Sequence, residues 1–270
     1  MTDPNEMGFF DHLEELRNRL IKSVGLWLIV FVICFIYAKP IFAWLAEPLV
    51  EISKSEHLFA ATRFEEPFLA NMRAAFWTSL ILSSLIFFYH FWGFVAPALT
   101  KEEKWFAIPF IIFMALFFIA GCWFSFEYVF PYALSYLMEW NAGELNAFTR
   151  SSYLHMLFLF VMGMGVSFEL PLVLLFLAKV GLVTSGFLLD KFRYAVVIIF
   201  IAAAIITPTP DPFMQTFLAA PILLLYLLGT GLAWLVQKKD EEEFEAMVQG
   251  ADGDSAEDQD GTPISEDWQK

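Results

Sequence analysis

The side chains best suited to chemistry in this sequence are a few carboxylates and amides that interrupt long apolar runs. Glu169 is the clearest of them, because it lies near the centre of the run from 152 to 178, in the segment VSFELPLV. A carboxylate at this depth of a membrane span costs on the order of 3 kcal/mol, so we expect it to face protein or water. Such a group suits a polar contact with a partner helix or a proton site. A hydrogen bond that merely fixes packing inside the bundle is the alternative.

A second group of polar residues lies in the segment TPTPDPFMQT, from 207 to 216. The prolines of this segment end one helix and force a reversal, which places Asp211 at the start of the next helix. A carboxylate there caps free backbone N–H groups and stabilises the helix by about 1 kcal/mol. Gln215 enters the following apolar run one turn later, so its amide needs a partner within the membrane.

Two acidic pairs complete the set of candidate residues. Glu102 and Glu103 lie between two lysines in the segment WGFVAPALTKEEKWF, and Glu14 and Glu15 lie just before the first apolar run. A solvated surface is the simplest interpretation of such charges. Because carboxylates bind guanidinium groups through paired hydrogen bonds, two acidic pairs on the same side of a membrane also favour a site for a basic ligand.

The element that must position Glu15 is the segment from 9 to 21, FFDHLEELRNRLI. Its apolar residues recur at steps of three and four, which predicts a short amphipathic helix at the membrane surface. The apolar face consists of Phe9, Leu13, Leu16 and Leu20. Glu15 and Arg19 are spaced i,i+4 on this helix, so an ion pair worth a few tenths of a kcal/mol is expected between them.

The sequence gives little reason to expect an enzyme. Its histidines are far apart, and neither a zinc-binding His pair, a nucleophile motif nor a glycine-rich phosphate loop is present in it. Both cysteines, Cys34 and Cys122, fall in apolar runs, where they are expected to be small buried residues. We therefore predict no catalytic residue, no metal, no cofactor and no nucleic-acid partner.

The composition predicts a helical membrane protein. Hydrophobic residues make up 59% of the chain and charged residues 17%, which is too apolar for a soluble globular domain. Hydropathy predicts an all-α, polytopic protein with six transmembrane helices, because each apolar run approaches the roughly 20 residues that a bilayer needs. The predicted spans are 20–38, 74–97, 106–126, 152–178, 194–206 and 213–236, of which the fifth is short. Short helices are expected at the outer interface within 39–73.

An even number of spans places both termini on the same side of the membrane. With this topology, eleven of the sixteen Lys and Arg residues lie on the side of the termini, so the positive-inside rule predicts that both are cytoplasmic. The first 236 residues are predicted to form the membrane domain. Residues 237–270 are polar and acidic, with twelve Asp and Glu against three Lys, which predicts a disordered tail.

Several spaced motifs resemble the TatC family, the receptor subunit of the twin-arginine protein translocase. They are HLEELRNRL before the first span, PF at Pro67 and Phe68, WGFVAPAL followed by KEE, GVSFELP around Glu169, and the TPxPDPxxQ turn that leads to AAP. The resemblance implies six helices in a curved, cup-like arrangement. One departure lies at Ser84, where the family often has a proline that kinks the second span, so this sequence offers no proline for such a kink.

The resemblance also implies a function and a set of site residues. It implies a receptor in the bacterial inner membrane that binds twin-arginine signal peptides of folded precursors, recruits single-span TatA-like and TatB-like subunits, and contacts membrane lipid and other copies of itself. Export is then driven by the proton gradient. The signal-peptide residues that it implies are Glu15, Glu103 and Phe94, with Leu16, Arg17 and Arg19 nearby. It further implies an intramembrane polar site of Glu169, Gln215 and Thr207, and sensitive positions at Pro48 and Asp211.

Two other classes of protein are compatible with the residues themselves. A proton-coupled secondary transporter of a small solute could use Glu169 as its relay. The sequence has no internal repeat of the kind that many transporters show, which lowers this expectation. A purely structural membrane scaffold would need none of these acidic residues for activity.

Overall fold

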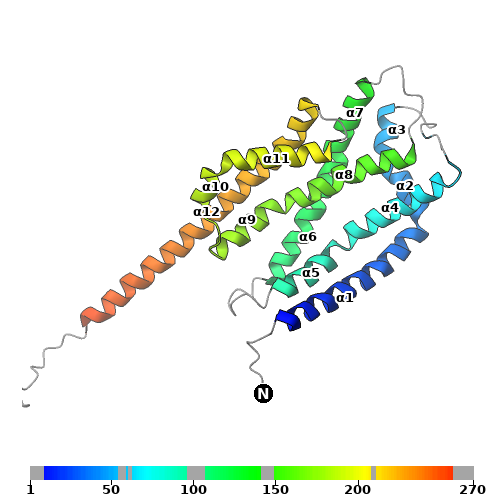
Figure 1. Ribbon diagram of the computed structural model, residues 1–270. Coiled ribbons are helices and arrows are strands. Elements are labelled where there is room, and N and C mark those ends of the chain that lie inside the picture. Colours follow the sequence, from blue (N-terminus) through cyan, green and yellow to red (C-terminus); the bar gives the residue numbers. More distant parts are fainter. Residues whose placement is uncertain are drawn as a thin grey trace, which may run out of the picture. The chain divides into compact units, whose positions relative to one another are not determined.

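Figure 1 shows the fold in a computed structural model that describes residues 9–53, 59, 63–95, 107–140, 149–207 and 211–257. The regular elements of this described part are helices, in agreement with the predicted all-α class. The chain divides into two compact units, one of residues Met1–Leu170 and Tyr194–Leu225, the other of Pro171–Arg193 and Tyr226–Lys270. We describe each unit by itself.

The first unit contains the helices that carry the candidate site residues. In chain order they are α1 (Phe9–Ile36), α2 (Ala38–Leu45), α3 (Glu47–Ser53), α4 (Glu66–Leu82), α5 (Ser84–Val95), α6 (Ala107–Phe124), the π-helical turn η3 (Ser125–Val129), α7 (Phe130–Trp140) and α8 (Arg150–Phe168). Helix α1 packs against α4 and α5, and α6 packs against α5 and α8. Most of α11 (Phe192–Ile206) and the beginning of α12 (Pro212–Glu257) also belong to this unit.

The second unit contains α9 (Leu170–Lys179) from its second residue, α10 (Ser185–Asp190) and the remainder of α12. Two side chains of α12 fix the turn around α10. The Tyr226 hydroxyl donates a hydrogen bond of 2.8 Å to the carbonyl of Leu188. The Gln237 amide oxygen accepts one of 3.0 Å from the backbone N–H of Ser185, which satisfies a free donor at the start of α10.

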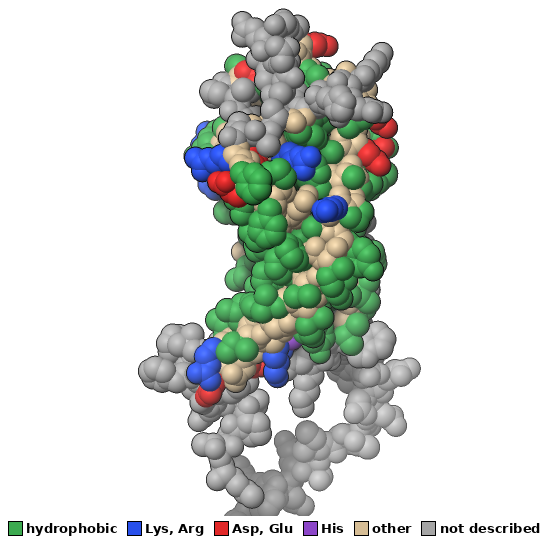
Figure 2. Space-filling view, turned by 90° about the vertical axis from the view of Figure 1, so that its right-hand side faces the viewer, with side chains coloured by type: hydrophobic (Ala, Val, Ile, Leu, Met, Phe, Trp, Pro, Cys, Tyr) green, Lys and Arg blue, Asp and Glu red, His purple; other side chains and the backbone are tan. Residues whose placement is uncertain are grey.

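The described helices fit a protein that crosses a membrane several times. Four apolar stretches are long enough to span a bilayer: Glu14–Ile36, Ile108–Glu139, Arg150–Lys179 and Pro212–Gln237. A bent pair, Glu66–Leu82 with Ser84–Gly93, can form a fifth, and Phe192–Ile206 is the short apolar helix that hydropathy predicted. On the face in Figure 2, apolar side chains fill the middle while charged ones gather toward the two ends. The count of six spans and the side of the termini remain predictions.

The second predicted span is bent although it contains no proline at position 84. Helices α4 and α5 meet at an angle of 49°. Ser83 and Ser84 are buried at the break, and the Ile86 N–H donates to the Ser83 carbonyl, three residues back, at 2.9 Å. The hydroxyls of both serines are buried without a hydrogen-bond partner among the described residues, so they do not bond to the backbone at the break. The kink is thus present without a proline, at a pair of small buried residues.

The end of the chain differs from the sequence-based prediction. Helix α12 continues to Glu257, about twenty residues beyond the predicted end of the last span, and so includes part of the segment that its composition predicted to be disordered. The residues just beyond the span, QKKDEEEFEAMVQ, are good helix formers, which favours continuation of a helix that has already formed. Residues 258–270 lie outside the described part, and the boundary at 236 remains a prediction.

Small residues allow α6 and α8 to approach closely. A Cβ atom added at Gly165 would lie 2.7 Å from the Cys122 sulfur, and one added at Gly121 would lie 2.8 Å from the backbone oxygen of Met164. Both cysteines are buried, as predicted. The Gly163 to Gly165 segment therefore acts as a packing surface, which is what small residues in a membrane span predict.

Short helices connect the first span to the second, as expected for 39–73. Helices α2 and α3 occupy residues 38–53 of this region. The Tyr153 hydroxyl of α8 donates a hydrogen bond of 2.7 Å to the carbonyl of Leu45 at the end of α2. The Arg150 guanidinium lies 5.0 Å from the ring centroid of Phe42, within the range of a cation–π contact. These contacts hold the α2–α3 segment on the start of α8.

Candidate functional site

Glu15 lies on α1 in a half-buried position and already holds one guanidinium. Arg19, one turn further along, donates to the same Glu15 oxygen, Oε1, from Nη2 at 2.6 Å and from Nε at 3.0 Å. The i,i+4 pair predicted from the sequence is therefore present. The second carboxylate oxygen, Oε2, is buried without a hydrogen-bond partner among the described residues. Oε2 of Glu15 is therefore an acceptor without a hydrogen bond, and a buried acceptor without a hydrogen bond destabilises the folded protein.

The carboxylate of Glu15 faces a cavity of about 490 Å³ between α1 and α5. Helix α5 contributes Tyr89 and His90 to the wall, while α1 contributes Asn18 and Lys22 beside the acidic residues. A Cβ atom added at Gly93 of α5 would collide with the Arg19 guanidinium, so a larger residue there would displace the end of that flexible side chain. Two helices, rather than α1 alone, therefore form the surroundings of Glu15.

The other predicted signal-peptide residues are placed only in part. Leu16 and Arg17 lie on the exposed side of α1, and Arg17 pairs with Glu14 at 3.1 Å. The backbone of Phe94 belongs to α5, one residue after Gly93, but its side chain lies outside the described residues. Glu103 lies outside the described residues altogether.

Glu169 lies at the junction of α8 and α9, where it follows the last residue of α8. Its side chain is only 8% exposed, and neither carboxylate oxygen has a hydrogen-bond partner among the described residues. The alternative of a hydrogen bond that fixes packing is therefore wrong for the described part of the chain. A buried carboxylate without a hydrogen-bond partner destabilises the folded protein. The packing of the described residues therefore does not explain why a glutamate occupies position 169.

The other two residues of the predicted polar site bind backbone carbonyls instead of Glu169. The Gln215 amide nitrogen donates to the carbonyl of Phe200 at 2.7 Å, which provides the partner within the membrane that was predicted. The Thr207 hydroxyl is buried and donates to the carbonyl of Ala203 at 3.0 Å. The structure therefore gives no hydrogen bond among Glu169, Gln215 and Thr207 in the described residues. The three residues belong to the same unit, but Gln215 and Thr207 bind different backbone carbonyls.

The two sensitive positions have structural contacts. The Asp211 carboxylate accepts a hydrogen bond of 2.8 Å from the N–H of Met214, so it caps α12 as predicted. The Tyr136 hydroxyl of α7 also approaches the same oxygen at 3.3 Å, which ties the turn to α7. Pro48 is buried in the first turn of α3, where a proline is well tolerated because its missing N–H would be unbonded.

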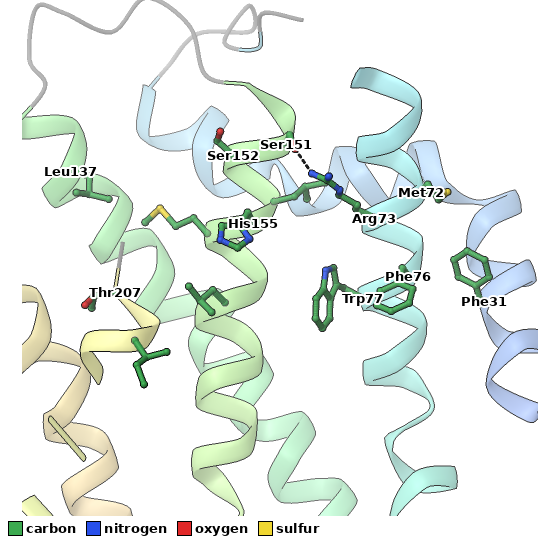
Figure 3. Close-up of a pocket in the computed structure, with 14 residues that line it drawn as sticks. Phe31, Met72, Arg73, Phe76, Trp77, Leu137, Ser151, Ser152, His155 and Thr207 are labelled. Carbon is green, nitrogen blue, oxygen red and sulfur yellow. Dashed lines mark hydrogen bonds between the residues drawn. The ribbon is translucent and has the colours of Figure 1, made fainter. Parts of the chain in front are cut away.

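The structure adds a larger cavity, of about 1060 Å³, that sequence reasoning did not find (Figure 3). Five helices of the first unit form its walls, and Thr207 is the one predicted site residue that lines it. Arg73 gives this cavity a positively charged side chain. The signal that could have revealed it is an arginine placed seven residues inside the apolar helix that begins at Glu66. In the described part of the chain, no group of three His, Cys, Asp or Glu side chains could hold a metal ion.

Comparison with known families supports the resemblance seen in the motifs. The family model described as "TatC: Sec-independent protein translocase protein (TatC)" matches residues 11–221. A Sec-independent protein translocase protein TatC from Koribacter versatilis is 32% identical over 250 residues, which is 92% of each chain. One from Helicobacter pylori is 39% identical over 238 residues, 86% of this chain and 90% of the relative.

A solved structure agrees with the fold. The crystal structure of the twin arginine translocase receptor TatC superposes with a TM-score of 0.74 at 34% sequence identity. The match covers 84% of this chain and 99% of the crystallised chain. At this identity and coverage, both the helical membrane fold and the order of its elements are shared.

Proposed function

Because the chain belongs to the TatC family of Sec-independent protein translocase proteins, we propose that it is the membrane receptor that binds twin-arginine signal peptides. Membership makes the chain a multi-pass component of a protein translocase. The finer proposal is that it recognises the signal peptide of a folded precursor on the cytoplasmic side of the inner membrane. The observation that carries this proposal is the state of Glu15, half-buried with one unused oxygen beside a cavity.

An arginine of the signal peptide would be bound by that unused oxygen once a rotation of the Glu15 side chain turns the buried atom toward the cavity. A guanidinium offers parallel N–H groups that match the two oxygens of a carboxylate, and charge-assisted hydrogen bonds are the stronger kind. The buried Oε2 atom gains a partner when the ligand arrives, so binding removes an existing cost as well as forming a new contact. Glu103 is proposed to hold the second arginine, and Phe94 with Leu16 to contact the apolar part of the signal.

Single-span TatA-like and TatB-like subunits are the proposed partners in the membrane. Glu169 supports this proposal, because its buried oxygens need a donor that the described residues do not supply. A polar or charged residue on a partner helix could supply it, and Gln215 and Thr207 could contribute further contacts. Transport would then use the proton gradient across the membrane.

Photo-crosslinking tests the receptor proposal directly. Tyr89 is replaced by the photoreactive amino acid benzoylphenylalanine, because its side chain is exposed and lines the Glu15 cavity. We expect a signal peptide with two arginines to crosslink at this position at least tenfold more than the same peptide with two lysines, which keep the charge but lose the paired geometry. Phe91 is the control, since it is equally exposed on α5 but does not line the cavity. Equal crosslinking of both peptides at Tyr89 would argue against an arginine-reading site.

Arg19 is expected to compete with the incoming arginine for Glu15. Arg19→Gln removes the internal guanidinium that lies 2.6 Å from Glu15. Since partly exposed ion pairs are worth up to about 1 kcal/mol, the substitution should raise the affinity for a twin-arginine peptide about three- to fivefold. Fluorescence anisotropy of a labelled peptide measures this change.

Arg17→Gln is the matched control for that experiment. It removes the same charge two residues away, but the Arg17–Glu14 pair is exposed, at 65% and 63% for the two side chains. Arg17 does not line the Glu15 cavity, although the family resemblance places it near the signal peptide, so a smaller change in affinity is expected for this variant than for Arg19→Gln. If Arg19→Gln weakened binding instead, Arg19 would be part of the binding surface and not a competitor for Glu15.

A further inference from the structure

The larger cavity of the first unit has a polar end and an apolar wall. Figure 3 shows Arg73, Ser151, Ser152 and His155 close together near one end, with Phe76 and Trp77 further along the helices. The polar residues come from two helices, α4 and α8. Nothing in the proposed signal-peptide or partner sites uses Arg73 or His155.

The polar end carries an available positive charge. Arg73 is exposed and lines the cavity, and among the described residues its guanidinium donates a hydrogen bond to the hydroxyl of Ser151. A guanidinium has five N–H donors, so most of them can still bind a ligand. The Glu66 carboxylate accepts a hydrogen bond from the backbone N–H of Ser151 at 3.5 Å. Glu66 is buried and is not one of the residues that line the cavity.

We expect this charge to lie near the level of the lipid phosphates. Arg73 lies seven residues beyond Glu66, the first residue of α4, which is about 10 Å along the helix axis at 1.5 Å per residue. Ser151 and Ser152 belong to the first turn of α8. The polar end is therefore near the ends of two membrane helices, at the level of the interface, and the aromatic wall extends from it toward the hydrocarbon.

The charge of the cavity favours a lipid over an apolar transmembrane helix. The cavity of about 1060 Å³ is open, so a ligand can extend out of it, and a helix of apolar residues brings no anion to Arg73. A phospholipid brings both a phosphate for the polar end and a slender acyl chain for the apolar wall.

We propose that this cavity binds one anionic phospholipid. The phosphate contacts the Arg73 guanidinium, with the His155 ring as a further donor. One acyl chain lies along Phe76 and Trp77. Basic pockets between membrane helices are suited to anionic headgroups, because a cation at the interface is only partly screened. This site is separate from Glu15 and does not depend on the proposed receptor function.

Native mass spectrometry of the full chain in detergent, titrated with phosphatidylglycerol, tests the proposal. The wild-type protein should bind one lipid tightly, and phosphatidylcholine, which has no net charge, should bind more weakly. Arg73→Gln should lower the affinity for phosphatidylglycerol at least fivefold, and Arg73→Lys should lower it less, because it keeps the charge. Arg63→Gln is the matched control, since Arg63 is an exposed cation that does not line the cavity, and it should change nothing.

A variant that fills part of the cavity provides a second test. Leu159→Trp adds bulk to the apolar wall and should also reduce lipid binding. If Arg73→Gln and Arg63→Gln lowered the affinity for phosphatidylglycerol equally, the lipid would respond to the general positive charge of the surface, and the proposal would be wrong. If Leu159→Trp leaves lipid affinity unchanged and instead blocks crosslinking of a partner subunit, the cavity receives a protein segment and the lipid site is wrong. Competition by millimolar inorganic phosphate would likewise assign the site to a free anion.

Discussion

Glu15→Gln is expected to reduce the affinity for a twin-arginine signal peptide by about ten- to a hundredfold. The substitution keeps the size of the side chain but replaces the buried oxygen, Oε2, or its partner oxygen by an amide that cannot accept from a guanidinium. Hydrogen bonds to charged groups are worth about 1.5 to 3 kcal/mol, and each 1.4 kcal/mol is a factor of ten in the dissociation constant. Titration of a labelled peptide measures the loss, and crosslinking at Tyr89 provides an independent readout.

Glu14→Gln is the control for this effect. It removes one negative charge from the adjacent residue, whose carboxylate is 63% exposed and paired with Arg17. Glu14 also lines the cavity, so a loss of affinity is expected here too, but a much smaller one than for Glu15→Gln, because exposed charges are well screened. If Glu14→Gln and Glu15→Gln weakened binding equally, the peptide would respond to the general negative charge of the surface. If neither weakened it, Glu15 would not be the arginine-reading residue, and a structural scaffold would become the better interpretation.

Glu169→Leu is expected to stabilise the protein while it abolishes association with the partner helices. Glu169 is buried with both oxygens unbonded among the described residues, and an unsatisfied buried group costs about 1 to 3 kcal/mol. An apolar side chain of similar volume removes that cost, so the free energy of unfolding should rise by a similar amount. Thermal unfolding in detergent detects the gain. Co-purification of a TatA-like or TatB-like subunit detects the loss.

Glu169→Gln separates docking from proton transport. Glutamine keeps hydrogen-bonding atoms at this position but cannot exchange a proton, so partner association and export should be retained at least in part. A proton-coupled transporter would instead lose its flux completely with this variant. If Glu169→Leu destabilised the protein, the carboxylate would have a stabilising contact, and its proposed role as an unfilled docking site would be wrong.

The class of protein and its individual candidate residues could be predicted from the sequence. Hydropathy depends on composition along a single run, which is why the apolar helices, including the short Phe192–Ile206, occur where they were expected. The Glu15–Arg19 pair and the Asp211 cap were predictable for the same reason. Each joins residues within one turn, so the local sequence determines both partners.

The kink between α4 and α5 could not be predicted by comparing motifs with the family. The absence of a proline at Ser84 removed the usual cause of a bend, yet the bend of 49° is present. A serine pair does not by itself determine whether a helix bends, and here neither hydroxyl has a hydrogen-bond partner among the described residues. Whether the helix bends depends on the packing around Ser83 and Ser84, and both are buried.

The sequence by itself determined a helical membrane protein of the TatC type, with its acidic residues at known positions along the helices. The tertiary structure alone decided what surrounds those residues. It placed Gly93 of α5 against Arg19, left Glu169 without a donor and gathered Arg73 and His155 around one cavity. The physical reason is that a side chain's partners on other helices follow from which helix faces meet. That depends on packing across the whole bundle, whereas periodicity and capping depend on a few adjacent residues.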